Sequence, residues 1–318
     1  MQDITVFGQF TAEQQKKRRL MDNFLDDIED IKKYLDDAEV TDIFIGGSGR
    51  IIYKKFGKGK IITNDYVRCS KAQGIILSLA ALTGKQVDPA SGLPKLECVI
   101  PHPYNARFTG MLPPWVEHPE LAIRKRAAHI FSLENYVETG RMTEGQYSVV
   151  CRYIKERKNI LAGGGTGSGK TTFTNAVLLK MYEYTPNDRF YIVEDVPELQ
   201  SKALDATFIS CKPQEASEAV RTALRWTPDR IIFGELRYGE VANELLKAWN
   251  TGHTGNITTI HADSSQSMIC RIEGLLREVI PGTIPDVREV IHLCVHLRST
   301  PQGPKISDVL ETGNALSH

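Results

Sequence analysis

The first 130 residues alternate short apolar runs with polar turns that contain glycine. Apolar residues at helical spacing, with Asp and Glu between them, predict an amphipathic helix with one buried face at Phe24, Ile28, Ile31 and Leu35. Two apolar runs joined by a glycine-rich turn predict a β-hairpin over residues 40–53. A helix at 70–82 and strands at 98–100 and 121–124 complete what we interpret as a small α+β domain.

From residue 143 onward, apolar runs of strand length alternate with helical patterns. Thr143 and Gln146 are spaced as a capping box at the start of a helix that runs towards residue 158. The apolar runs that follow are 160–162, 190–193, 208–210, 231–233 and 257–260. Helical patterns between and after them predict a mostly parallel sheet with helices on both faces. We therefore expect two domains, 1–130 and 143–318, joined by a polar hinge at 131–142.

The composition is that of an ordinary globular protein, and it argues against several function classes. Of 318 residues, 41% are hydrophobic and 25% charged, and the formal net charge is zero. Because nucleic-acid-binding proteins carry a basic excess, direct binding to nucleic acid is not expected. The six cysteines include no C-x-x-C pair, which argues against a zinc ribbon or a disulfide framework and favours a reducing cytosol.

Few features of the chain favour direct contact with a membrane. The N-terminus is polar, unlike a signal peptide, and the most apolar run, 75–82, is too short to cross a bilayer. Four basic residues at 16–19 are interpreted as the solvated start of a helix, because four charges are the lower limit of a lipid-binding cluster. Membrane association is therefore expected to be peripheral or through a partner protein.

The strongest chemical signal lies in residues 164–172. Gly164-x-x-x-x-Gly169-Lys170-Thr171 follows an apolar strand and precedes a helix, which is the pattern of a phosphate-binding loop. Glycines let successive N–H groups line a concave anion site, and the helix points its positive end towards it. Lys170 is expected to reach the β- and γ-phosphates, and the Thr171 hydroxyl to bind Mg²⁺. The predicted nucleotide-binding residues are Gly164, Gly165, Thr166, Gly167, Ser168, Gly169, Lys170, Thr171 and Thr172.

Three more of the predicted strands end in ionisable residues: Glu194, Glu235 and His261. In a parallel sheet the carboxyl ends of the strands meet at one edge, where ligands bind. Hydrolysis of a phosphoanhydride needs a carboxylate that orients or deprotonates water, and Glu235 is the first candidate and Glu194 the second. His261 can hydrogen-bond the γ-phosphate, and His253, in the loop before the same strand, is a further candidate sensor.

The strand that leads to Glu235 lacks the aspartate that usually orders the water around Mg²⁺ in phosphate-loop enzymes. Gly234 takes that position. Binding of Mg²⁺ is therefore expected to depend on Thr171, the phosphates and water. Glu194 and Glu198 are the further expected ligands, partly through water.

Four segments together resemble the secretion traffic ATPase superfamily, which includes type II and type IV secretion ATPases, conjugation ATPases and pilus motors. They are similar to its Walker A motif, aspartate box, Walker B motif and histidine box, in that order: 164–172, 193–199, 229–237 and 251–261. Gly before Glu is normal in the Walker B motif of this family. Since the chain has no tetracysteine zinc module, it most resembles the conjugal-transfer and type IV secretion branch.

The resemblance implies a RecA-like ATPase domain that binds ATP and Mg²⁺, preceded by the smaller α+β domain. It also implies a homohexameric ring with nucleotide between the two halves of a subunit and near a neighbour. Arg107 or Arg124 would then reach the phosphates from the first half, within one subunit or across to the next. Hinge motion driven by ATP would transmit force to a conjugation or type IV secretion machine at the cytoplasmic face of the bacterial inner membrane.

Other interpretations stay open. The four boxes do not separate a conjugation or secretion motor from a motor that assembles or retracts type IV or tight-adherence pili. Outside the enzymes, the alternative is a nucleotide-dependent binding switch with negligible turnover. A nucleic-acid translocase is disfavoured by the zero net charge and by the lack of a stripe of basic and aromatic residues.

Overall fold

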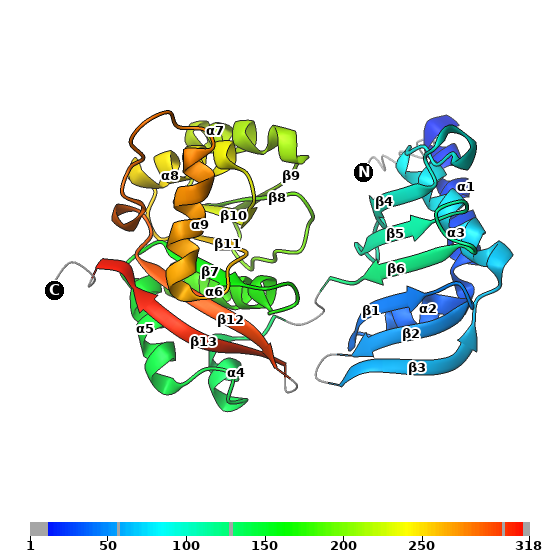
Figure 1. Cartoon of the computed structure of the whole chain (residues 1–318), viewed down its shortest axis with the longest axis horizontal. Coiled ribbons are helices and arrows are strands. Elements are labelled where there is room, and N and C mark those ends of the chain that lie inside the picture. Colours follow the sequence, from blue (N-terminus) through cyan, green and yellow to red (C-terminus); the bar gives the residue numbers. More distant parts are fainter. Residues whose placement is uncertain (1–11, 56–57, 127–129, 301–302, 314–318) are drawn as a thin grey trace, which may run out of the picture. The chain divides into compact units, whose positions relative to one another are not determined.

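The structure, a computed structural model, describes residues 12–55, 58–126, 130–300 and 303–313. The polar stretch expected at the very N-terminus lies mostly outside these ranges. The chain divides into two compact units, Met1–Ala128 and His129–His318, and each unit has its own sheet (Figure 1). In the ranges described, no helix is both long enough and apolar enough to span a membrane.

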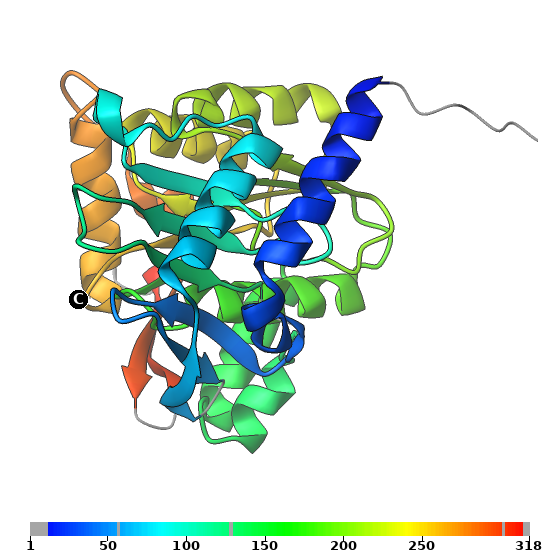
Figure 2. The ribbon, with the colours of Figure 1, turned by 90° about the vertical axis from the view of Figure 1, so that its right-hand side faces the viewer.

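The N-terminal unit is an antiparallel sheet of six strands in the order β3-β2-β1-β6-β5-β4. Its strands are β1 (Val40–Ile45), β2 (Arg50–Lys55), β3 (Gly59–Tyr66), β4 (Lys95–Val99), β5 (Arg107–Met111) and β6 (Glu120–Arg124). Its helices are α1 (Ala12–Asp27), α2 (Glu29–Asp36), α3 (Cys69–Thr83) and the short 3₁₀ turn η1 (Pro89–Ser91). Figure 2 shows α1 and α3 side by side on one face of this sheet.

The apolar residues predicted to share one helical face are all buried in this unit: Phe24, Ile28, Ile31 and Leu35. Phe24 lies on α1, and Ile31 and Leu35 lie on α2. The helix is interrupted between them at Ile28, whose ψ of 3° is not helical. The hairpin predicted over 40–53 is confirmed as β1 and β2. The basic residues at 16–19 are exposed on α1, as a solvated helix face requires.

The C-terminal unit is a seven-stranded sheet in the order β13-β12-β7-β11-β10-β8-β9, parallel except for the pair β12–β13. Its strands are β7 (Ile160–Gly164), β8 (Phe190–Glu194), β9 (Ala206–Ser210), β10 (Arg230–Leu236), β11 (Ile257–Ile260), β12 (Leu293–Thr300) and β13 (Gly303–Glu311). Its helices are α4 (Leu133–Glu138), α5 (Glu144–Lys155), α6 (Lys170–Tyr184), α7 (Ala216–Trp226), α8 (Gly239–Asn250) and α9 (Ser265–Arg277). Two 3₁₀ turns, η2 (Pro213–Glu215) and η3 (Val287–Glu289), complete the unit.

Helices cover both faces of this sheet, as the alternating pattern predicted. Helices α7, α8 and α9 share one hydrophobic core with the sheet, and α4, α5 and α6 share the other. The four strands at the centre are buried along nearly their whole length because they have helices on both sides. The predicted class, a RecA-like α/β domain preceded by a smaller α+β domain, is confirmed.

Two parts of the C-terminal unit differ from the expectation. Residues 131–142, expected as a hinge, include α4, whose Leu133 and Tyr136 are buried in the core shared with α6. The hairpin of β12 and β13 was not predicted. Its outer strand β13 is only partly buried, so apolar and polar residues alternate weakly along it.

Candidate functional site

The phosphate-binding loop joins the buried strand β7 to helix α6, as its spacing predicted. The backbone of Gly164, Gly167 and Gly169 has positive φ angles of 153°, 74° and 89°, which residues with a Cβ rarely adopt. A Cβ at Gly164 would also collide with the carbonyl oxygen of Leu297. Glycine is therefore required here both for the turn itself and for its close approach to β12.

Lys170 is the first residue of α6, and its side chain folds back over the loop. Its Nζ atom donates to the carbonyl oxygens of Gly164 and Gly165 at 2.9 and 3.1 Å. On the next residue, the Thr171 hydroxyl donates to the Glu198 carboxylate at 3.1 Å. The two residue types expected to bind phosphate and Mg²⁺ thus lie side by side at the start of one helix.

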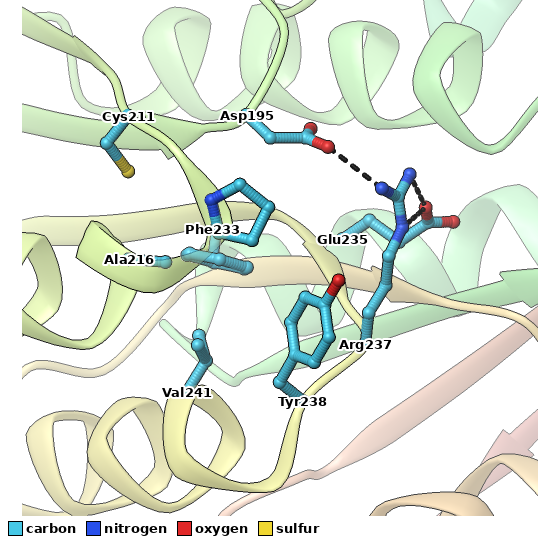
Figure 3. Close-up of a pocket in the computed structure, with 9 residues that line it drawn as sticks. Asp195, Cys211, Ala216, Phe233, Glu235, Arg237, Tyr238 and Val241 are labelled. Carbon is cyan, nitrogen blue, oxygen red and sulfur yellow. Dashed lines mark hydrogen bonds and ion pairs between the residues drawn. The ribbon is translucent and has the colours of Figure 1, made fainter. Parts of the chain in front are cut away.

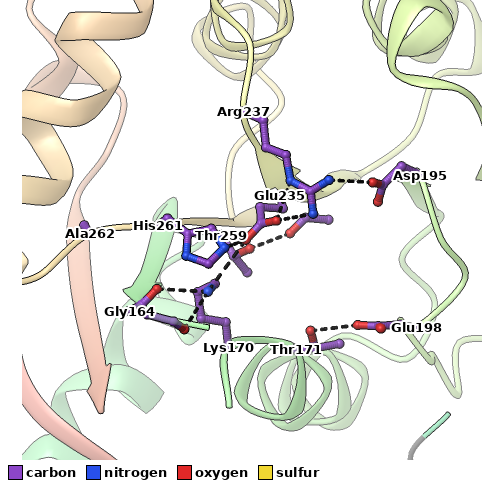
Figure 4. Close-up of polar contacts among 12 residues, drawn as sticks. Gly164, Lys170, Thr171, Asp195, Glu198, Glu235, Arg237, Thr259, His261 and Ala262 are labelled. Carbon is purple, nitrogen blue, oxygen red and sulfur yellow. Dashed lines mark hydrogen bonds and ion pairs between the residues drawn. The ribbon is translucent and has the colours of Figure 1, made fainter. Parts of the chain in front are cut away.

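Glu235 lies next to this lysine. It stands near the end of β10, and its Oε1 atom is 3.6 Å from Lys170 Nζ and 3.0 Å from His261 Nε2 (Figure 4). The carboxylate is largely buried, whereas the His261 side chain is 48% exposed and therefore accessible to a ligand. Two side chains that the sequence placed in the phosphate loop or at a strand end, Lys170 and His261, thus both lie within ion-pair distance of Glu235.

Arg237 is a member of the site that the sequence analysis did not assign. Its Nε atom donates to Glu235 at 2.7 Å, and its NH1 group donates to Asp195 at 2.8 Å (Figure 4). Burial lowers the pKa of Arg237, but the bonds to these two carboxylates outweigh burial and raise it above the ordinary value. The signal in the sequence was the spacing, because residues i and i+2 of an extended strand point to the same face.

Glu194, the second candidate for the water-activating carboxylate, is placed differently. Its Oε2 atom accepts the backbone N–H groups of Glu198 and Leu199, each at 2.9 Å. The side chain therefore shapes the loop that presents Glu198 to Thr171. A Cβ at Gly234 would lie 3.1 Å from Glu194 Cβ, so an aspartate at this position would require β8 and β10 to shift slightly apart.

A small cavity of ≈ 20 Å³ lies on the Arg237 side of Glu235 (Figure 3). It is lined by Asp195, Cys211, Pro213, Ala216, Phe233, Glu235, Arg237, Tyr238 and Val241. Its size suits about one water molecule. None of its lining residues belongs to the phosphate loop, so it adjoins the site and is distinct from the place where phosphates would bind.

Three of the predicted site residues are not part of the cluster that the C-terminal unit forms around Glu235: His253, Arg107 and Arg124. His253 lies at the opposite, amino-terminal edge of the sheet, before β11, with its Nδ1 atom 3.0 Å from the carbonyl oxygen of Pro228. Direct contact of His253 with phosphates in the loop of the same subunit is therefore excluded. Arg107 and Arg124 belong to the N-terminal unit, where they face each other across β5 and β6.

Comparison with known proteins identifies relatives of this chain among secretion and conjugation proteins. A model of the family described as type II/IV secretion system protein matches residues 94–296, more than half of the chain. A probable conjugal transfer protein TrbB of Sinorhizobium fredii is 35% identical over 279 residues, which cover 87% of this chain and 84% of that protein. The type IV secretion system protein VirB11 of Bartonella quintana is 27% identical over 293 residues, covering 79% of this chain and 80% of that protein.

Solved structures with the same fold include a pilus motor and a bacterial ATPase. The pilus retraction motor PilT with bound ADP superposes with a TM-score of 0.62 at 18% identity, covering 89% of this chain and 82% of that one. The ATPase DotB of Legionella pneumophila superposes with a TM-score of 0.58 at 19% identity, covering 92% and 81%. At such identities the likeness shows the fold alone. The extent of the family match, joined to the 35% identity with a conjugal transfer protein, shows that this chain belongs to the type II/IV secretion ATPase family.

Proposed function

We propose that the protein is an ATP-hydrolysing motor that acts as a homohexamer and powers a conjugation or type IV secretion machine. The observation that carries this proposal is the position of Glu235, whose carboxylate lies 3.6 Å from the ammonium group of the phosphate-loop lysine. A binding loop alone would hold a nucleotide. A carboxylate beside the lysine adds the group that hydrolysis needs next to the terminal phosphate.

Each side chain of the cluster has a distinct task in this proposal. The Lys170 ammonium, now held by carbonyl and carboxylate oxygens, would exchange them for the chemically similar oxygens of the β- and γ-phosphates. Glu235 would orient the attacking water, and Arg237 and His261 would hold its carboxylate in position. Arg107 or Arg124 would stabilise the negative charge that develops on the γ-phosphoryl group.

The residues near Thr171 fit Mg²⁺. The Thr171 hydroxyl and the Glu198 carboxylate, 3.1 Å apart, are the oxygen donors that this ion prefers. Among the described residues, no group of three or more His, Cys, Asp or Glu side chains could hold a metal ion. When bound, Mg²⁺ would neutralise charge on the phosphate oxygens. Since Glu194 holds two backbone N–H groups, Glu198 is the better of the two expected carboxylates.

The proposed assembly would bring two arginines from outside the ATPase unit to the site. A ring of six subunits would bring the N-terminal unit of one subunit to the phosphates bound by the same subunit or its neighbour. The relatives named for conjugal transfer and type IV secretion support the proposed machine, with the motor peripheral at the cytoplasmic face of the inner membrane.

The first test is the ATPase rate per subunit, measured while the protein concentration is raised. If assembly completes the sites, the rate will rise steeply and then reach a plateau. A rate that stays constant down to concentrations at which only monomer exists would contradict the ring. Lys170→Ala is the control, because it removes the phosphate-binding ammonium and is expected to abolish turnover at every concentration. Wild-type turnover in this variant would contradict hydrolysis at this loop.

A further inference from the structure

The hairpin of β12 and β13 contacts two segments of the site: the phosphate loop and the segment that follows His261. Strand β12 pairs with β7 along its length, so that Leu297 faces Gly164 at the start of the phosphate loop. Pro304 of β13 packs so closely on Gly169 that a Cβ at Gly169 would collide with its ring. The hairpin therefore packs directly against both ends of the phosphate loop.

The same hairpin also holds the segment that follows His261. After β11 the chain runs through residues 261–264 to α9, whose Met268 packs on Gly163 of β7. His296 of β12 is 3.2 Å from the Ala262 carbonyl oxygen through Nε2. Asp308, which faces His296 across the hairpin, accepts the hydroxyl of Ser265 at the start of α9. Two facing residues of the hairpin thus hold the two ends of this segment.

The chemistry of the partners determines where the His296 ring carries a proton. A carbonyl oxygen can only accept a hydrogen bond, so Nε2 must be the donor to Ala262. The second nitrogen, Nδ1, is 2.6 Å from the Ser307 hydroxyl, which can either donate to it or accept from it. The Ser307 hydroxyl in turn lies 3.0 Å from the backbone oxygen of His296. Both ring nitrogens are engaged, and the ring orientation is therefore determined from two sides.

We propose that His296 is a positioning residue that acts through His261. By holding the carbonyl oxygen of Ala262, it keeps the adjacent His261 imidazole at Glu235, where the two side chains lie 3.0 Å apart. The proposal rests on the proposed role of His261 in ATP hydrolysis. The C-terminal hairpin then does more than add two strands to the sheet, because it positions both the phosphate loop and His261.

The test is a double-mutant cycle with His296 and His261. His296→Leu removes the donor at similar bulk and is expected to lower kcat by about tenfold while leaving the affinity for a fluorescent ADP unchanged. His296→Gln, whose amide N–H can replace Nε2–H, is expected to recover most of the rate. If His296 acts through His261, adding His296→Leu to His261→Ala will cause no further loss.

Controls separate this proposal from a general effect on folding and from the proposed function. Arg298→Leu, on the same strand, is expected to keep the wild-type rate, and thermal melting of each variant reports folding. Wild-type kcat in His296→Leu, or losses that multiply in the double variant, would overturn the positioning role. If His261→Ala itself keeps full turnover, His261 has no role in hydrolysis, and the proposed positioning role of His296 fails as well. The Lys170→Ala result then still decides whether this loop hydrolyses ATP.

Discussion

Glu235 and Glu194 are both carboxylates at the ends of neighbouring strands, yet their surroundings give them different tasks. Glu235 faces three cationic or donor side chains: Lys170, Arg237 and His261. Glu194 faces two backbone N–H groups of the loop that follows its own strand. At the scale of single residues, the partner of each carboxylate therefore distinguishes a group that can act on a ligand from one that shapes a loop.

This difference predicts unequal effects of two equally conservative changes. Glu235→Gln is expected to lower kcat by about 10²-fold or more, because an amide does not orient or deprotonate water as a carboxylate does. Nucleotide affinity should remain. Glu194→Gln keeps an oxygen that accepts the same two N–H groups, so its kcat should fall by less than about tenfold. Steady-state ATPase assays and binding of a fluorescent nucleotide measure both. The reverse order of effects would move the water-activating role to Glu194.

At the scale of elements, the helices under the phosphate loop are tied together by one carboxylate. Glu134 of α4 accepts the hydroxyl of Tyr147 on α5 at 2.6 Å and pairs with Lys180 on α6. Because α6 begins at Lys170, this contact connects the segment that leads in from the N-terminal unit with the helix that would bind phosphate. Burial raises the pKa of Glu134, but the bonds from Lys180 and Tyr147 outweigh burial and lower it to about 2.

A lowered acid pKa predicts a pH dependence of stability. The stabilisation by Glu134 is complete above its ordinary pKa of 4.5 and is lost as the pH falls towards about 2. Glu134→Gln should lower the free energy of unfolding at pH 7 by about 1 kcal/mol, since the carboxylate is partly exposed and screened by solvent. Denaturant unfolding from pH 7 to 3 should show the two proteins converging. A difference that stays constant with pH would contradict the ion pair, and Glu138→Gln on the same helix is the matched control.

The start of α5 offers a second prediction at this scale. The Thr143 hydroxyl accepts the backbone N–H of Gln146 at 3.2 Å, and the Gln146 side chain accepts the N–H of Thr143 at 3.0 Å. Thr143→Ala removes one half of this capping box and should cost about 1 kcal/mol of unfolding free energy. Thr143→Ser, which keeps the hydroxyl, should stay close to wild type in the same denaturant titration. Equal losses in both variants would show that the hydroxyl is not the stabilising group.

At the scale of the whole molecule, the proposed role of the N-terminal arginines predicts a slow but folded variant. Arg124→Ala should lower kcat by roughly 10²–10³-fold and leave nucleotide binding intact, because it removes charge stabilisation from the reaction and nothing from the phosphate loop. Thermal melting checks the fold. A rate equal to wild type would show that Arg124 has no part in the reaction. The charge-stabilising role would then pass to Arg107, which pairs with Arg124 across β5 and β6.

Mixing two inactive variants then decides between action within a subunit and action across the ring. Subunits with Lys170→Ala keep their arginines, and subunits with Arg124→Ala keep their phosphate loop. If the arginine acts on a neighbour, mixed rings contain complete sites, and ATPase activity returns on mixing. If it acts within its own subunit, every site in the mixture still lacks one group and the mixture stays inactive.

The sequence by itself determined the phosphate loop, the class of both domains and the set of strand-end residues. Each of these depends on short-range physics: glycine conformations, helix starts and the alternation of apolar runs. The interruption at Ile28 and the helix within residues 131–142 were not predicted, because tertiary packing decides where such short elements begin and end.

Only the tertiary structure decided which strand ends meet. The order β7-β11-β10-β8 brings Glu235 of β10 and His261 after β11 to Lys170, and leaves Glu194 of β8 one strand further away. The same order puts His253 at the far edge, although it lies only eight residues before His261 in the chain. Strand order and pairing register arise from contacts between segments far apart in sequence. That is why most residues of the site could be predicted from the sequence, whereas Arg237 and the contacts between these residues could not.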